Sequence, residues 1–174
     1  CMLVATAKTT VAPVTSENDA LYQPLLEAIT SVFIELAQGL VRDGEGASKF
    51  VAVKVTGGKT EQECLKVAYT VAESPLVKTA LFASDPNWGR LLMAIGRAEV
   101  DSFNVNLVSV SLNGVLIAED GCRASSYTEE SGQKAMDEEE ITIAIDLARG
   151  EQTATVWTSD LSNEYVRINA EYRT

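Results

Sequence analysis

Histidine is absent from this sequence of 174 residues. Without it, the chain alone cannot assemble a Ser-His-Asp or Cys-His relay, and a zinc site lacks one of its usual ligands. Any nucleophilic chemistry therefore needs another base. The α-amino group of an N-terminal nucleophile can serve near neutral pH, because its unperturbed pKa is near 8.

Cysteine is also scarce. The three cysteines, Cys1, Cys64 and Cys122, are odd in number, far apart in the sequence and without a CxxC spacing. This pattern predicts reduced thiols in the cytosol rather than a disulfide framework or a metal centre.

Long apolar runs are missing too, since no segment approaches the roughly 18 apolar residues that a spanning helix needs. The chain has 14 basic against 25 acidic residues, a formal charge of −11, which repels phosphate backbones and anionic lipid headgroups. We therefore expect a cytoplasmic chain that binds neither nucleic acid nor membrane. Its length suits a single compact unit, residues 1–174.

Hydrophobic periodicity predicts the secondary structure of the first half. Apolar residues recur every three or four positions in 19–41, which indicates a helix with one broad buried face. Val51, Val53 and Val55 alternate with other residues, which indicates a strand at 49–56. Further helices are predicted at 60–73, where Thr60 and Glu63 have the spacing of a capping box, at 76–83, at 88–97, and from Leu161 with Asp160 as its cap.

The second half reads mainly as strands. Asn113-Gly114 favours a type I′ turn between strands at 105–112 and 115–118. A second antiparallel pair is predicted at 140–147 and 152–158, and 121–137 as a loop with one short helix. A short strand is also expected at 2–6. The predicted class is α+β, or layered α/β, with helices packed on mixed or antiparallel sheets.

The segment 42–49, Arg-Asp-Gly-Glu-Gly-Ala-Ser-Lys, could carry chemistry. Glycines on both sides of Glu45 present its carboxylate on an exposed turn, where it could receive a substrate ammonium group. A solvated turn without function is the alternative.

A second unusual segment is 84–90, Ser-Asp-Pro-Asn-Trp-Gly-Arg. Asp85 or Asn87 could cap the following helix, and Arg90 could pair with a carboxylate. The composition suits an active-site loop and a structural corner filled by Trp88 equally well. The chain end, 160–174, reads from composition only as a fraying helix.

Together these segments resemble the ornithine acetyltransferase family, also called the bifunctional arginine-biosynthesis proteins. The resemblance runs from Cys1 to Thr174 in one order and is carried by 42–49, 74–82, 84–90 and 160–174. It implies a glutamate N-acetyltransferase of arginine biosynthesis that moves acetyl from N-acetylornithine to glutamate through an acetyl-threonine intermediate. It implies no metal and no cofactor, and many members also accept acetyl-CoA as a substrate.

Members of this family cut themselves before a threonine, which becomes the nucleophile at the start of a β chain. Cys1 resembles that start superficially, but only 43 residues separate it from Glu45, whereas about eighty do so in the family. The resemblance therefore implies that this chain is the C-terminal part of a β chain. The threonine, the Thr-Gly oxyanion pair and the α chain would lie upstream, in an α2β2 or higher assembly.

The resemblance also implies the substrate-binding residues. Glu45 would receive the amine end of the substrate, and Asn169 and Thr174 would hold it from the C-terminus, with no catalytic residue in this chain. Two other functions stay open at this point: an N-terminal-nucleophile aminopeptidase that uses Cys1, and a non-catalytic amine-binding subunit.

Overall fold

The computed structural model describes residues 3, 6 and 8–172, and it divides the chain into two compact units, Cys1–Leu40 and Val41–Thr174. The single compact unit expected from the sequence is thus divided after Leu40. We consider each unit by itself. The strand expected at 2–6 falls largely outside the described residues.

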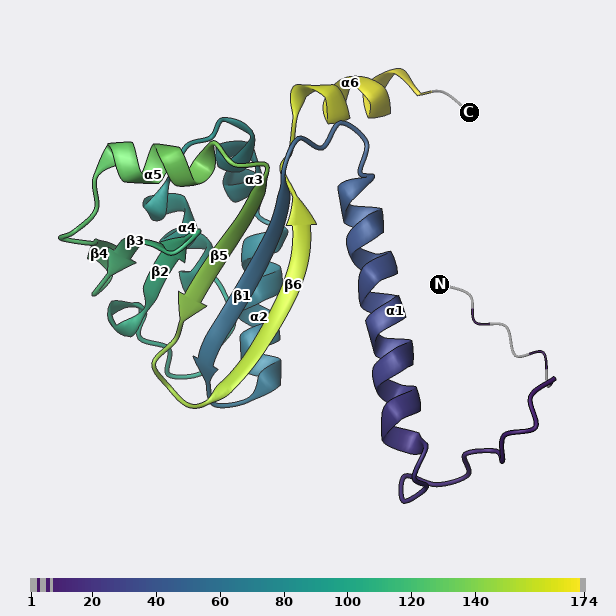
Figure 1. Ribbon diagram of the computed structural model, residues 1–174. Coiled ribbons are helices and arrows are strands. Elements are labelled where there is room, and N and C mark those ends of the chain that lie inside the picture. The colour runs from purple at the N-terminus through teal and green to yellow at the C-terminus, as the bar shows by residue number, and fades with distance from the viewer. Residues whose placement is uncertain (1–2, 4–5, 7, 173–174) are drawn as a thin grey trace. The chain divides into compact units, whose positions relative to one another are not determined.

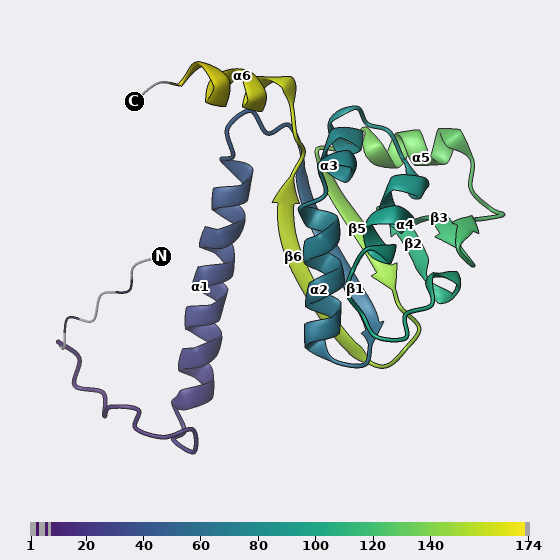
Figure 2. The ribbon, with the colours of Figure 1, turned by 180° about the vertical axis from the view of Figure 1, so that it is seen from behind.

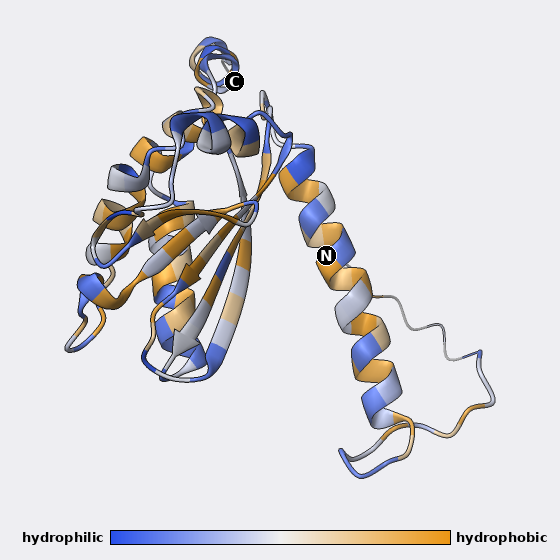
Figure 3. Ribbon diagram, turned by 60° about the vertical axis from the view of Figure 1, so that its left-hand side comes forward, coloured by the Kyte–Doolittle hydropathy of each residue, from blue (hydrophilic) through white to orange (hydrophobic). Residues whose placement is uncertain are grey.

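The main element of the first unit is helix α1, Tyr22–Arg42, whose last two residues belong to the second unit. The predicted helix is confirmed, but its buried face is not, because no residue of α1 is buried within the described chain. Its apolar face includes Leu25, Val32 and Leu36, each about half exposed. By length and composition alone α1 could cross a membrane. Apolar and polar residues alternate along it in Figure 3, however, which makes it amphipathic.

The second unit is built on one six-stranded mixed sheet with the order β4-β3-β2-β5-β1-β6. Its strands are β1 (Phe50–Gly58), β2 (Ser109–Leu112), β3 (Val115–Glu119), β4 (Cys122–Arg123), β5 (Glu140–Asp146) and β6 (Gln152–Ser159). Strand β1 runs parallel to β5 and antiparallel to β6. The predicted α+β class, with helices on a mixed sheet, is confirmed.

The helices of the second unit are α2 (Glu61–Ala72), α3 (Pro75–Phe82), α4 (Trp88–Gly96), α5 (Glu129–Met136) and α6 (Asn163–Glu171), with a 3-10 turn at Val105–Leu107. Helices α2, α3 and α4 lie on one face of this sheet, whereas α6 extends beyond its end (Figures 1 and 2). Helix α2 packs on β1 and β6, and α4 packs on β3 and β4. The core between them is made of alternating strand residues that are at most 1% exposed, among them Val51, Val53, Val55, Ile141, Ile143 and Ile145.

The predicted hairpin of β5 and β6 is wrong, because β1 lies between these two strands. The connection that follows β5 wraps around the end of β1. Its Leu147 N–H donates to Thr56 O at 3.0 Å, and the N–H groups of Arg149 and Gly150 donate to Gly57 O at 2.7 and 2.8 Å. The connection is as short as a hairpin loop, but its hydrogen bonds are made with a strand about 90 positions earlier.

Three local predictions also need correction. Residues Val105–Leu107 form the 3-10 turn rather than the start of β2. Strand β4, Cys122–Arg123, lies in the segment 121–137, for which the sequence predicts a loop with one short helix. At α2, Thr60 accepts the Glu63 N–H as predicted, but the Glu63 carboxylate lies 2.5 Å from Arg149 Nε instead of completing a capping box. The Asn113-Gly114 turn is as predicted, with φ values of 46° and 82°.

Candidate functional site

The register of the sheet brings the two candidate binding segments together. Strands β1 and β6 are antiparallel, and Phe50 at the start of β1 pairs with Ser159 at the end of β6. The loop before β1, which carries Glu45, therefore lies beside the start of α6, which carries Asn169. Figure 1 shows both segments at the same end of the sheet.

Glu45 and Asn169 contact each other directly. The Asn169 side-chain amide donates to Glu45 Oε2 at 3.2 Å and to the Tyr165 carbonyl at 2.9 Å. With both amide hydrogens used, Glu45 Oε1 and Asn169 Oδ1 remain as acceptors without a hydrogen-bond donor among the described residues. Both side chains are exposed. The pair thus presents a surface of acceptors only, which suits a ligand rich in N–H donors, such as an ammonium group.

The charge of Glu45 is not neutralised by a neighbour in the part of the chain that the structure describes, where no cation lies within ion-pair distance of it. Arg167, on the same helix as Asn169, is held by Glu164 and Glu171. These contacts lower the pKa of Glu164 and raise that of Arg167. The nearest guanidinium on α6 is therefore occupied, and Glu45 is left to attract a cation from outside.

Glycine is required at position 46 of the loop. Its φ is +68°, and a Cβ there would come 2.7 Å from the Tyr165 backbone nitrogen and 2.9 Å from Ser162 Oγ. The backbone on the C-terminal side of Glu45 therefore packs directly against the first turn of α6. The turn that the glycines on both sides of Glu45 predict is therefore present, and it approaches another backbone closely.

Asp160 does not cap α6, contrary to the prediction. Its Oδ1 accepts the N–H groups of Ser48 and Lys49 at 2.8 and 3.0 Å, and its Oδ2 accepts the Ser48 hydroxyl at 2.6 Å. Ser162 is the cap, since its Oγ accepts the Tyr165 N–H at 3.0 Å. The long-range donors of the 42–49 loop compete with the helix for Asp160, which a local capping rule does not consider.

Lys78 is a residue whose position the sequence did not predict. Its Nζ donates to Thr158 Oγ1 at 3.0 Å and to the Ser159 carbonyl, and its own carbonyl accepts the Leu161 N–H at 3.1 Å. Burial lowers the pKa of Lys78, and the nearby Asp160 carboxylate opposes this shift. No carboxylate lies three or four positions from Lys78 in the sequence. This absence indicates that the partner of Lys78 lies elsewhere in the chain.

An open hollow of about 480 Å³ lies next to the Glu45 loop. It is lined by Arg42, Ala47, Ser48, Lys49, Phe50, Glu139 and Glu140. Arg42 lies over the Phe50 ring, 3.6 Å from its centroid, and pairs with Glu140 at 2.6 Å. Lys49 Nζ donates to the Met136 and Glu138 carbonyls at 2.6 and 3.1 Å. Arg42 and Lys49, two cations that line the hollow, therefore already have partners.

The 84–90 segment joins α3 to α4 through local contacts. Asn87 caps α4 through the Arg90 N–H at 3.0 Å and donates to Asp85 at 3.0 Å. The Arg90 guanidinium bonds the Leu76 carbonyl at 2.9 Å and Thr79 Oγ1 at 3.3 Å, which ties α4 to α3. Trp88 packs against the core. The alternative of a capping Asn87 is confirmed; Arg90 pairs with α3 and not with a carboxylate.

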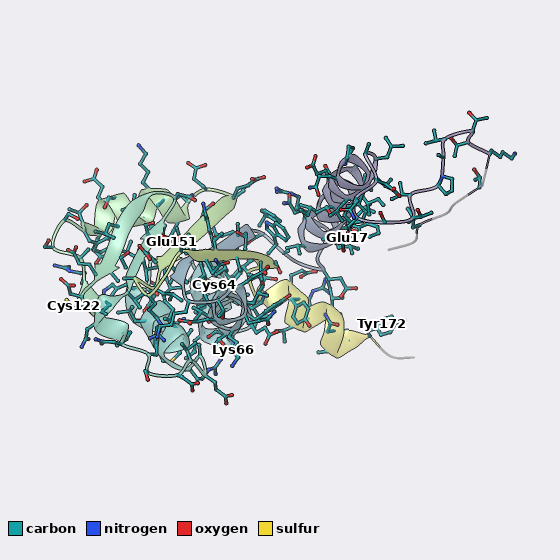
Figure 4. The ribbon with its side chains drawn as sticks, turned by 90° about the horizontal axis from the view of Figure 1, so that it is seen from below. Glu17, Cys64, Lys66, Cys122, Glu151 and Tyr172 are labelled. Carbon is teal, nitrogen blue, oxygen red and sulfur yellow. The ribbon has the colours of Figure 1, made fainter. Side chains whose placement is uncertain are left out.

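The described cysteines are free thiols in different environments. Cys64 is buried under the sheet and Cys122 lies exposed at its edge (Figure 4). Burial raises the pKa of Cys64. No group of three or more potential metal ligands occurs among the described residues. Cys1 and Thr174, two of the candidate residues, lie outside the described part; Tyr172, the last residue described, is 75% exposed.

Comparison with known proteins gives consistent matches. The model of the ArgJ family matches residues 1–174. The arginine biosynthesis bifunctional protein ArgJ of Pseudomonas syringae pv. tomato is 57% identical over 174 residues, which are 100% of this chain and 43% of that protein. Its counterpart from Neisseria meningitidis serogroup A is 52% identical over 172 residues, 99% of this chain and 42% of that protein.

A solved structure supports the same relationship. The crystal structure of arginine biosynthesis bifunctional protein argJ from Bacillus halodurans has a TM-score of 0.86 and 31% sequence identity, and the match covers 92% of this chain and 75% of that chain. The chain spans less than half the length of the Pseudomonas and Neisseria relatives. The family resemblance and the fold class inferred from the sequence are both confirmed.

Proposed function

Because this chain belongs to the ArgJ family, we propose that it is part of a glutamate N-acetyltransferase of arginine biosynthesis and supplies the amine-binding side of its active site. The complete enzyme would transfer acetyl from N-acetylornithine to glutamate in the cytoplasm, with acetyl-CoA as a second acyl donor. No resident metal or cofactor takes part in this proposal. Glu45, Asn169 and Thr174 are the substrate-binding residues.

The observation that carries this proposal is the contact between Glu45 and Asn169. Side chains from distant parts of the sequence meet at 3.2 Å and leave one carboxylate oxygen and one amide oxygen free to accept. Ornithine derivatives carry an ammonium group, which has three donors and no acceptor.

The acyl transfer itself would use residues upstream of this chain. A threonine hydroxyl attacks the acetyl carbonyl carbon, and its proton passes to the threonine α-amino group. The amide C–N bond breaks, and ornithine leaves with that proton. The neutral glutamate amine would then attack the carbonyl carbon of the threonine ester. Its N–H proton passes through the threonine α-amino group to the threonine oxygen as the ester C–O bond breaks, which restores the hydroxyl. Backbone and side-chain donors of the α chain would stabilise the oxyanion.

The exposed face of α1 supports a partner from the same longer protein. Within the described residues no residue of this amphipathic helix is buried, and an apolar helix face of this kind is suited to being covered by a partner. More than half of the length of the relatives lies outside this chain. We propose that this remaining part, the α chain and the start of the β chain, covers α1 in an autoprocessed α2β2 or higher assembly.

The test is Glu45→Gln in the complete enzyme. Loss of a charge-assisted bond to the substrate ammonium should raise the KM for N-acetylornithine about tenfold or more. The melting temperature should not change, because Glu45 is exposed. Glu151→Gln, which alters another exposed carboxylate at the opposite end of the sheet, is the matched control. An unchanged KM in Glu45→Gln would remove Glu45 from the site.

A further inference from the structure

The connection between β6 and α6, residues 160–162, contacts both segments of the candidate site. We propose that Asp160 and Ser162 are positioning residues, which fix Glu45 and Asn169 relative to each other so that both reach the same substrate amine. This role rests on the proposed function of Glu45 and Asn169. It assigns a separate function to two residues that do not themselves face the substrate.

Helix α6 has little else to hold it in place. None of its residues, Asn163–Glu171, is buried in the described chain. A helix without a buried face gains almost nothing from hydrophobic packing, so its position depends on its polar contacts. Two polar contacts tie α6 to the loop before β1: Ser162, its N-cap, donates to the Gly46 carbonyl, and Asn169, in its last turn, donates to Glu45.

Ser162 joins the two halves of the site through one hydroxyl group. It donates to the Gly46 carbonyl at 2.6 Å, one residue after Glu45, and it accepts the Tyr165 N–H at 3.0 Å. The Tyr165 carbonyl in turn accepts the Asn169 amide. A continuous path of hydrogen bonds thus runs from the Glu45 loop through Ser162 to Asn169.

Asp160 fixes the other end of the same loop. Its carboxylate accepts three hydrogen bonds from Ser48 and Lys49, and only 4% of the residue is exposed. Asp160 and Ser162 belong to the few buried polar residues in the described part of the chain. Burying a carboxylate is unfavourable unless its acceptors are satisfied, so this arrangement stabilises a single loop conformation.

Lys78 holds the connection from the opposite side. It bonds the Ser159 carbonyl with its ammonium group and the Leu161 N–H with its backbone carbonyl. The connection is therefore fixed to α3 on both sides of Asp160, at Ser159 and at Leu161. These contacts give the 74–82 segment of the family resemblance a structural role: it anchors the site without touching it.

The experiment compares Ser162→Ala with Ser162→Thr in the complete enzyme. Alanine removes both bonds of the hydroxyl, whereas threonine keeps an Oγ at the cap position. We expect Ser162→Ala to raise the KM for N-acetylornithine about tenfold, because small displacements of binding groups have large effects, with kcat changed much less. Ser162→Thr should restore most of the affinity. Asp160→Asn should act in the same direction as Ser162→Ala.

Thr60→Ala is the matched control, since Thr60 caps α2 at the far end of β1 through the Glu63 N–H. It removes a cap of the same kind without touching the site, so its KM should equal that of the wild type. The double variant Glu45→Gln with Ser162→Ala provides a second measurement. If Ser162 acts through Glu45, its substitution should raise the KM by less than twofold in the Glu45→Gln background.

The outcomes separate the two proposals. If Glu45→Gln leaves the KM unchanged, the proposed function fails, and the positioning role fails with it. If Glu45→Gln raises the KM but Ser162→Ala behaves like Thr60→Ala, only the positioning role is overturned. Independent, multiplicative effects in the double variant would also overturn it, because they would show that Ser162 does not act through Glu45.

Discussion

The Asn169 side chain donates a hydrogen bond to Glu45 at 3.2 Å although the two residues are 124 positions apart. Neither residue is buried, so no core packing forces this contact. It follows from the antiparallel register of β1 and β6, which places the start of β1 and the end of β6 at the same end of the sheet. The pair is therefore a product of the fold and can be tested residue by residue.

Removing the Asn169 amide should weaken substrate binding without unfolding α6. In Asn169→Ala, Glu45 loses the donor that orients its carboxylate, and we expect the KM for N-acetylornithine to rise about five- to tenfold, the loss of one or two hydrogen bonds. Asn163→Ala removes another exposed amide from the same helix and should leave the KM unchanged. Equal KM values for the two variants in steady-state kinetics would contradict a role for Asn169.

Alanine at position 46 should disturb both stability and binding. Gly46→Ala requires a left-handed backbone and places Cβ against the Tyr165 nitrogen, so we expect a loss of about 1–3 kcal/mol in the free energy of unfolding and a raised KM. In Gly96→Ala, nothing lies within 4 Å of the new Cβ in a helix, and the protein should be as stable as the wild type or more so. Denaturant titration of both variants measures the difference.

Lys78 should make stability depend on pH on the alkaline side. Burial lowers its pKa in the folded state, so between that value and the ordinary 10.5 the unfolded chain binds more protons than the folded one. Stability therefore increases as the pH rises through this window. The free energy of unfolding of the wild type, relative to Lys78→Met, should rise from pH 8 towards pH 10.5. The exposed Lys54→Met should give no such trend.

The buried pair of Glu63 and Arg149 should be sensitive to removal of one partner. Each side chain is only 10% exposed, and their atoms lie 2.5 Å apart without the alignment of a hydrogen bond. Arg149→Leu leaves the carboxylate buried and unpaired and should cost about 3–5 kcal/mol. The double variant with Glu63→Leu should be more stable than Arg149→Leu alone. Thermal unfolding that shows the opposite order would contradict a charge-based effect.

A charge on the apolar face of α1 should prevent assembly. Leu36 is 47% exposed on that face, and Leu36→Asp should lower the fraction of complete enzyme found by sedimentation when the chain is produced with the rest of its precursor. Ser31→Asp, on the polar face, should assemble normally. Unimpaired assembly of Leu36→Asp, or binding of the wild-type chain to lipid vesicles through α1, would contradict the proposed covering of this helix.

Features with a local signal were predictable from the sequence. The Thr60 cap, the proline at the start of α3 and the Asn113-Gly114 turn each depend on side chains within a few positions, and the structure contains all three. The strand partners were not predictable in this way. The short connection after β5 has the length of a hairpin loop, and only the parallel pairing with β1 determines that β6 crosses to the far side.

The site was predictable to a similar extent. The glycines around Glu45 indicated an exposed carboxylate, whereas Asn169 is one exposed amide on a polar helix and was found through the family resemblance alone. The sequence pattern favours Asp160 as the cap of α6, but Ser162, two positions later, is an equally good capping residue and is the cap in the structure. The choice between them is made by Ser48 and Lys49, more than a hundred positions away, which no local pattern contains.

The place of β1 in the middle of its half of the sheet determines when the site can form during synthesis. Its neighbours β5 and β6 leave the ribosome long after it, since paired residues are about 90 positions apart in the parallel pair. The loop that carries Glu45 cannot form its hydrogen bonds to Asp160 and Ser162 until these residues have been synthesised, and α6 follows them in the chain. A chain that stops before α6 could complete its sheet and still lack the contact between Glu45 and Asn169.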